Sequence, residues 1–221
     1  MNKLLFRTLA MALIYVMLKF FGGTLGRQAL YPVTLLVTFL HEFGHALGAI
    51  LTGGKVVGMQ INPDGSGQTT SVPGSLPVIL MGGYLGSTIL GNLLFFIGAK
   101  RSGWSQPTLV FLAGLMLFAA IVWHENWVSS GLLVGFGALL FFIAHKTTWD
   151  RDVLMFLGLA AILYIIEDFN VGPSSDLAQF ESVVGGPKTF WMYLWLILAG
   201  GLFLLNLKLV FRNLKLADFK K

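Results

Sequence analysis

Seven apolar segments divide this chain of 221 residues, and their lengths constrain the fold more than any other feature. A helix that crosses a bilayer needs about 20 mostly apolar residues, because the hydrocarbon core is roughly 30 Å thick. Hydrophobic residues make up 56% of the chain and charged residues 11%, which is a membrane composition. The segments are Leu4–Phe21, Tyr31–Thr52, Leu76–Ala99, Thr108–Trp123, Trp127–His145, Val153–Ile166 and Phe190–Phe211. Because the fourth to sixth are short, we predict an all-α polytopic membrane protein with six or seven transmembrane helices.

The chain has a length that suits one compact unit, so we expect a single integral-membrane domain over residues 1–221, in the cell membrane. Residues 1–23 carry Lys3 and Arg7 ahead of an apolar stretch, as in a signal peptide, but Lys19 interrupts that stretch and no convincing cleavage site follows. That segment is therefore interpreted as a membrane helix. The formal charge of +5 comes without a basic stripe interleaved with exposed aromatics. This pattern argues against nucleic acid as a partner and fits helix flanks that meet the lipid bilayer.

A change of pattern separates the second and third apolar segments. Residues 56–61 and 68–72 are short β-prone runs, and Asn62-Pro63-Asp64-Gly65 between them is typical of a turn. The sequence therefore predicts a short β-hairpin, whose open edge can pair with an extended peptide. In the third segment, Gly83, Ser87 and Gly91 form a small-residue stripe, which predicts close packing on the second segment.

The motif His41-Glu42-Phe43-Gly44-His45 lies inside the second apolar segment, where Glu42 is the only formal charge. Residues four apart on a helix face the same way, so His41 and His45 can bind one metal ion. Glu42 lies beside that face, where it can take a proton from a metal-bound water, as in the HExxH metallohydrolases. Ionisable groups at membrane depth are costly and usually functional. We therefore predict His41 and His45 as zinc ligands and Glu42 as the catalytic base. The alternative is that the three residues only hydrogen-bond to neighbouring helices.

Cysteine is absent, which excludes disulfides, thiolate zinc ligands and thiol nucleophiles. Besides the motif, only His124 and His145 remain as histidine alternatives. Both lie at the ends of apolar segments, where charged and aromatic residues gather for reasons unrelated to metal binding.

Several stretches together resemble the M50 family of intramembrane zinc metalloproteases, most of all the M50B-like branch of the site-2 protease group. They are HEFGH on a membrane helix, Gly-Gly-Lys after it, the Pro-Asp-Gly-Ser-Gly hairpin and Gly-Gly-Tyr-Leu-Gly near the start of the next helix. The resemblance is strongest from Thr38 to Gly91. It implies a Zn²⁺ ion held by the two motif histidines and a distant acidic residue, with the motif glutamate as general base.

Three aspartates are candidates for the third zinc ligand. In the larger site-2 proteases it belongs to an Asp-Gly motif that follows Asn and Pro on a later membrane segment. The sequence Asn62-Pro63-Asp64-Gly65 matches this motif, but it falls in the predicted hairpin, where the residue preferences of a tight turn already explain it. Asp176 follows a later segment and precedes a helical run, in a Ser-Asp-small context that M50B-like sequences share. We predict Asp176 as the third ligand, with Asp168 and Asp64 as alternatives.

The resemblance implies an intramembrane zinc endopeptidase that hydrolyses a peptide bond in or near a membrane-spanning segment, with Glu42 activating a zinc-bound water. Its substrate would be a membrane-anchored protein. Two alternatives use the same histidines: a membrane metal-binding protein or transporter, and a non-proteolytic scaffold of the M50 fold. No convincing repeat relates the two halves of the chain, as transporters often show. The intact His, Glu, His set argues against the scaffold.

Overall fold

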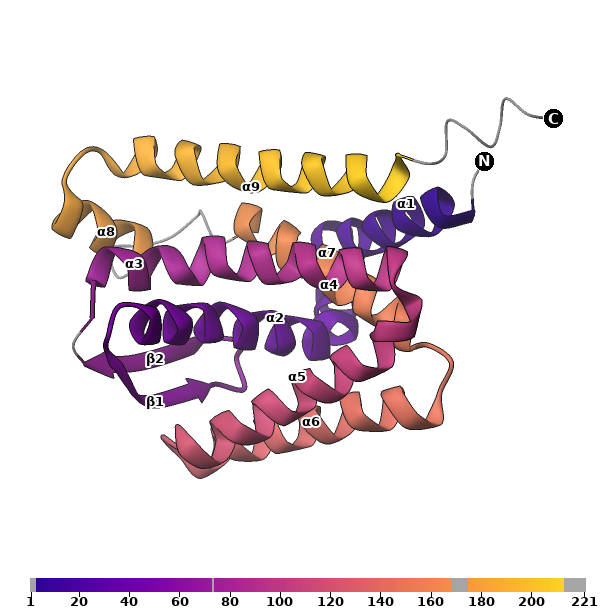
Figure 1. Cartoon of the computed structure of the whole chain (residues 1–221), viewed down its shortest axis with the longest axis horizontal. Coiled ribbons are helices and arrows are strands. Elements are labelled where there is room, and N and C mark those ends of the chain that lie inside the picture. The colour runs from indigo at the N-terminus through magenta and orange to yellow at the C-terminus, as the bar shows by residue number, and fades with distance from the viewer. Residues whose placement is uncertain (1–2, 73, 168–174, 213–221) are drawn as a thin grey trace.

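The computed structural model describes residues 3–72, 74–167 and 175–212. Figure 1 shows a bundle of helices with a small two-stranded sheet beside α2. The α-helices are α1 (Lys3–Val16), α2 (Gly23–Leu51), α3 (Leu76–Met81), α4 (Ser87–Lys100), α5 (Ser105–Val122), α6 (Trp127–Lys146), α7 (Asp150–Glu167), α8 (Asp176–Val184) and α9 (Lys188–Phe211). The strands are β1 (Lys55–Ile61) and β2 (Gly67–Val72), and the short elements are η1 (Met17–Phe21), η2 (Gly82–Gly86) and η3 (Ser102–Trp104).

Six helical stretches in the described part of the chain are long and apolar enough to cross a membrane. They are residues 3–21, 23–51, 76–100, 102–122, 127–146 and 188–211. The predicted fold class, a polytopic helical membrane protein with a short hairpin, is confirmed. The sixth predicted segment also forms a helix, α7, but its first turn carries Asp150 and Asp152. This helix packs inside the bundle against α4, where Met155 and Ala160 are fully buried.

Helix α2 starts earlier than the apolar pattern predicts, at Gly23 instead of Tyr31. The break before it lies at Gly22 and Gly23, and Gly23 has a positive φ of 55°. Pro32 lies inside the helix. A proline has no N–H, so one backbone carbonyl of the preceding turn loses its hydrogen bond, and groups on neighbouring helices can satisfy that carbonyl in a membrane protein. The result is one helix of 29 residues with the HEFGH motif in its second half.

The third predicted segment forms α3, η2 and α4 in succession, and η2 is a π-helical turn made of the Gly-Gly-Tyr-Leu-Gly sequence. Glycines on both elements let η2 approach α2 closely: a Cβ on Gly44 of α2 would lie 2.1 Å from the carbonyl oxygen of Gly82, and a Cβ on Gly82 would lie 2.4 Å from that of Gly44. The predicted packing on α2 therefore holds for this turn. It is wrong for Gly91, which contacts Gly158 and Ala161 of α7 instead. The π-turn η2 lies between α3 and α4, and π-turns are frequent at functional sites.

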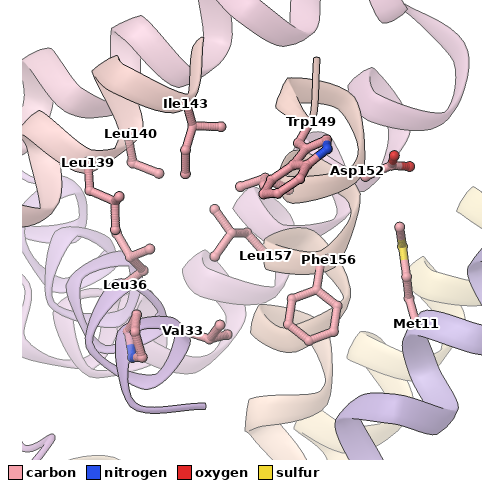
Figure 2. A pocket seen from close by; sticks show the side chains of 12 residues that line it. Met11, Val33, Leu36, Leu139, Leu140, Ile143, Trp149, Asp152, Phe156 and Leu157 are labelled. Carbon is pink, nitrogen blue, oxygen red and sulfur yellow. The ribbon is translucent and has the colours of Figure 1, made fainter. Parts of the chain in front are cut away.

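Two features of the bundle lie outside the motif region. Buried Asn206 of α9 donates from Nδ2 to the backbone oxygen of Asn92 at 2.7 Å and to its Oδ1 at 2.9 Å, which joins α9 to α4. A mostly apolar hollow of about 490 Å³ lies between α1, α2, α6 and α7. Figure 2 shows the side chains that line it. Its lining includes Leu36 and Phe156 but no residue of the HEFGH motif, so it is separate from the candidate site.

Candidate metal centre

The two motif histidines lie one turn apart on α2 and point in the same direction. Their Nε2 atoms are 3.1 Å apart, and each residue is 7% exposed. The tight contact of Gly44 with η2 fixes this face of α2 against the next membrane helix. The helical spacing therefore produces the pair of imidazole nitrogens that the motif predicts.

A carboxylate from a distant part of the chain completes a triangle with these nitrogens. The Oδ2 atom of Asp176 lies 3.1 Å from Nε2 of His41 and 3.1 Å from Nε2 of His45. Asp176 is the first residue of α8, whose start is capped by Ser175 Oγ accepting from the Ala178 N–H at 3.2 Å. Packing of α8 against α3 brings it over α2. Zinc bonds of about 2.0–2.2 Å at tetrahedral angles place ligand atoms roughly 3.3 Å apart, so the triangle fits a zinc ion.

The hydrogen bonding of His45 explains why a cation suits this triangle. Nδ1 of His45 lies 2.7 Å from the carbonyl oxygen of Ile79, which can only accept a hydrogen bond. Assigning the proton to Nδ1 leaves a lone pair on Nε2 of the neutral ring. That lone pair then faces the carboxylate of Asp176, and the two repel unless a positive charge lies between them. A histidine that donates its other N–H to a carbonyl is the usual arrangement of a metal ligand.

The surroundings of Asp176 determine the protonation state of its carboxyl group. Burial alone raises the pKa of this carboxyl group, but the neighbouring imidazoles of His41 and His45 outweigh burial and hold the pKa well below its usual range. Asp176 is therefore ionised at neutral pH. A carboxylate with one oxygen directed at two imidazoles is a suitable third zinc ligand.

The other two aspartates are placed differently or lie outside the described residues. Asp64 is exposed at the hairpin turn, where its Oδ1 accepts from the Ser66 N–H at 2.9 Å and from the Ser66 hydroxyl at 2.7 Å. These two hydrogen bonds lower the pKa of Asp64 and account for its position as turn chemistry. Asp168 lies outside the described residues.

Glu42 lies beside the triangle, is 5% exposed and is held by the hairpin. The ligand-type atoms of His41, Glu42 and His45 all lie within 4.8 Å of one another. The hydroxyl of Thr69 on β2 lies 2.8 Å from Oε2 of Glu42 and 3.0 Å from its backbone oxygen, and can donate to either. Gly67 of β2 leaves room for the carboxylate, because a Cβ there would lie 2.7 Å from Cγ of Glu42.

One glycine keeps open the space in front of the histidines. A Cβ on Gly83 of η2 would lie 2.5 Å from Nε2 of His45 and 2.6 Å from Nε2 of His41. We therefore expect Gly83→Ala to displace the imidazoles and abolish zinc binding, as measured by metal content of the purified protein. Gly131→Ala on α6 is the matched control, because nothing lies within 4 Å of its new Cβ and zinc content should not change. Equal zinc in both variants would show that Gly83 does not border the ion.

The site opens into a polar cavity of about 680 Å³. Its lining comprises Thr38, His41, Glu42, His45, Ser66, Gly67, Gln68, Thr69, Thr70, Ser71, Leu76, Ile79, Leu80, Tyr84, Tyr164, Ser175, Asp176 and Gln179. Strand β2 thus borders the cavity along most of its length. Strand β1 pairs with β2 on one side, and on the other side its Met59 N–H donates to the carbonyl oxygen of Trp123 at 2.8 Å.

Sequence reasoning missed several residues of this cavity. The sequence predicts Thr69 as part of the hairpin but does not indicate its contact with Glu42, and it marks Tyr84 only as a member of the Gly-Gly-Tyr-Leu-Gly stretch. Tyr164 and Gln179 carry no recognisable signal in the sequence. The other histidines lie elsewhere: Nδ1 of His124 contacts the Ser130 hydroxyl at 2.7 Å, and neither His124 nor His145 lines the cavity.

Fold and site together define a multi-pass membrane protein with a buried His-Glu-His cluster that can hold a metal ion. The family model of Peptidase M50B-like proteins matches residues 7–206. The chain therefore belongs to the Peptidase M50B-like family, and the resemblance found in the sequence is confirmed. Among curated proteins and solved structures, none matches the chain. Peptidases of the M50 family are zinc metalloproteases.

Proposed function

We propose that this protein is an intramembrane zinc endopeptidase that cleaves membrane-anchored proteins in or near a membrane-spanning segment. The observation that carries the proposal is the convergence of His41 Nε2, His45 Nε2 and Asp176 Oδ2 at 3.1 Å from one another. These three atoms would hold the ion. The carboxylate of Glu42 lies beside them in a cavity large enough for a peptide segment and water.

A zinc ion bound here supplies Lewis-acid polarisation of a peptide carbonyl and lowers the pKa of water toward neutrality. Glu42 is the general base in the proposed reaction: its carboxylate accepts a proton from the attacking water and returns it to the leaving amine. Thr69 positions this carboxylate through its hydroxyl, 2.8 Å from Oε2. The hairpin therefore sets the orientation of the base as well as one wall of the cavity.

The substrate must reach the site as an extended chain. A helical segment in lipid uses its carbonyl groups in its own hydrogen bonds, so it has to unwind before water can attack one of them. Strand β2 offers partners for the unwound backbone, because residues 67–71 line the cavity that holds the candidate ligands. Addition of a substrate strand to β2 is a common mode of peptide recognition and supports this role.

Metal removal in reconstituted vesicles tests the proposal. The purified protein is combined in liposomes with single-span reporter proteins whose membrane segments contain Gly-Pro pairs, which weaken the helix. We expect reporter cleavage, complete loss of cleavage after chelation, and recovery on addition of Zn²⁺. Cleavage that survives chelation would contradict the zinc mechanism. Zinc uptake into the vesicles without cleavage of any reporter would favour the transporter.

A further inference from the structure

The two ends of the helix bundle differ sharply in charge. We call the basic end the part formed by the start of α1, the α4–α5 and α6–α7 connections and the end of α9. We call the site end the part formed by the hairpin, the α5–α6 turn, α8 and the start of α9. The basic end carries eight cations, Lys3, Arg7, Lys100, Arg101, Lys146, Arg151, Lys208 and Arg212, against Asp150 and Asp152. The site end carries Lys55 and Lys188 against Asp64, Glu125, Asp176 and Glu181.

Contacts between helices show that the basic end is one continuous surface. Arg151 at the start of α7 donates from Nε to the carbonyl oxygen of Gly98 at 2.8 Å and from Nη2 to that of Ala99 at 3.0 Å, near the end of α4. Arg7 of α1 contacts Asp152 of α7 at 3.3 Å. In Figure 1, α1 begins and α9 ends on this same side of the molecule. The remaining described cations, Lys19 and Arg27, flank the start of α2, away from the α2–β1 junction.

The path of the chain alternates between these two ends. Helix α2 runs to the hairpin, α4 returns to Lys100, and α5 runs back to Trp123, which bonds to Met59 of β1. Helix α6 starts at the site end, where Asn126 donates to Gln60 at 3.1 Å, and ends at Lys146. Helix α7 returns to the site, where the rings of Tyr164 and His41 are 6.0 Å apart, and α9 ends at the basic end. From α2 onward the chain therefore crosses in alternating directions, and the α4–α5 and α6–α7 connections, which carry Lys100, Arg101, Lys146 and Arg151, lie on one side.

We infer that the basic end faces the cytoplasm and that the candidate metal centre opens toward the opposite side of the membrane. Lysine and arginine in short connections stay on the cytoplasmic side during insertion, where anionic lipids attract them. The basic end carries eight cations and the site end carries two, so the positive-inside rule assigns the basic end to the cytoplasm. The +8 of the basic end falls only to +6 when its two aspartates are included.

Together with the proposed function, on which this step rests, the orientation determines the side of the membrane from which the substrate reaches the site. Glu42 precedes Leu51, the last residue of α2, by nine positions, which places it about 14 Å from the site end of that helix. In a core roughly 30 Å thick, this depth lies close to the midplane and is reached from the side away from the cytoplasm. The scissile segment of the substrate therefore enters the site from the non-cytoplasmic side, near the middle of its membrane span.

Single-cysteine labelling tests the orientation, because the native chain contains no cysteine. Ser102→Cys and Thr148→Cys report on the basic end, and Ser182→Cys reports on the site end. All three positions are exposed and uncharged, so the substitutions leave the charge pattern intact. Thr189→Cys, at the exposed start of α9, is a second reporter of the site end. The reagent is a membrane-impermeant maleimide added to right-side-out vesicles, before and after detergent.

We expect Ser182→Cys and Thr189→Cys to be labelled before detergent, and Ser102→Cys and Thr148→Cys only after it. Labelling of the basic-end cysteines in intact vesicles, alone or equally with the others, would overturn the inference. The result does not depend on catalysis. An inactive protein with the expected labelling would refute the proposed function alone, whereas an active protease with reversed labelling would refute the orientation alone.

Discussion

Replacing Glu42 by glutamine is expected to abolish peptide cleavage while leaving bound zinc unchanged. Glutamine keeps the shape of the side chain and its oxygen can still accept from the Thr69 hydroxyl, which is 2.8 Å from Oε2 in the native protein. It cannot accept the proton of the attacking water. General acid–base catalysis contributes about 10²–10⁴-fold to a rate, so we expect a loss of that size in cleavage of the membrane-anchored reporter.

The matched control is Glu125→Gln, an exposed glutamate in the α5–α6 turn. This variant loses the same charge but is not part of the cavity, so it should cleave like the native protein. Metal content of both variants is measured on the same preparations. Cleavage by Glu42→Gln within a few-fold of the native rate would eliminate Glu42 as the base.

Replacing Asp176 by alanine is expected to remove zinc from the purified protein. The substitution deletes the oxygen that lies 3.1 Å from both histidine nitrogens, and only two ligands remain. Loss of a mere hydrogen-bond partner of a ligand weakens metal binding about 10–100-fold, and loss of the ligand itself should exceed that range. Zinc per protein molecule and affinity by competition with a chelator measure the effect.

Asp64→Ala is the control for this prediction, because the motif letters around Asp64 copy those of the larger site-2 proteases. Asp64 hydrogen-bonds to Ser66 at the hairpin turn, so its removal should loosen the turn and leave zinc in place. Zinc lost from Asp64→Ala but retained by Asp176→Ala would reverse the assignment of the third ligand.

The features that depend on local sequence could be predicted. The spacing of His41 and His45 determines that both rings share one face of any helix, and Asn62-Pro63-Asp64-Gly65 determines a tight turn between two short strands. Apolar length predicted the membrane helices. Their ends were less certain, since Gly23 starts α2 eight residues before the apolar pattern becomes continuous, and α7 carries charges in its first turn yet lies buried in the bundle.

The features that depend on tertiary packing could not be derived from the pattern. Asp176 is separated from His41 by 135 positions, and only the packing of α8 on α3 brings its carboxylate to the imidazoles. The sequence therefore left a choice among three aspartates. The roles of Gly83 and Thr69 also arise from packing: one leaves space in front of the histidines, and the other reaches Glu42 because the hairpin folds back along α2.

Zinc X-ray absorption on the purified native protein tests the proposed metal centre most directly. We expect one zinc ion per molecule, with two imidazole nitrogens at about 2.0–2.1 Å and oxygen ligands at about 2.0–2.2 Å. The imidazole scattering should disappear in the double variant His41→Ala, His45→Ala. A native protein that binds no zinc, or whose zinc has no imidazole ligand, would contradict the proposed metal centre.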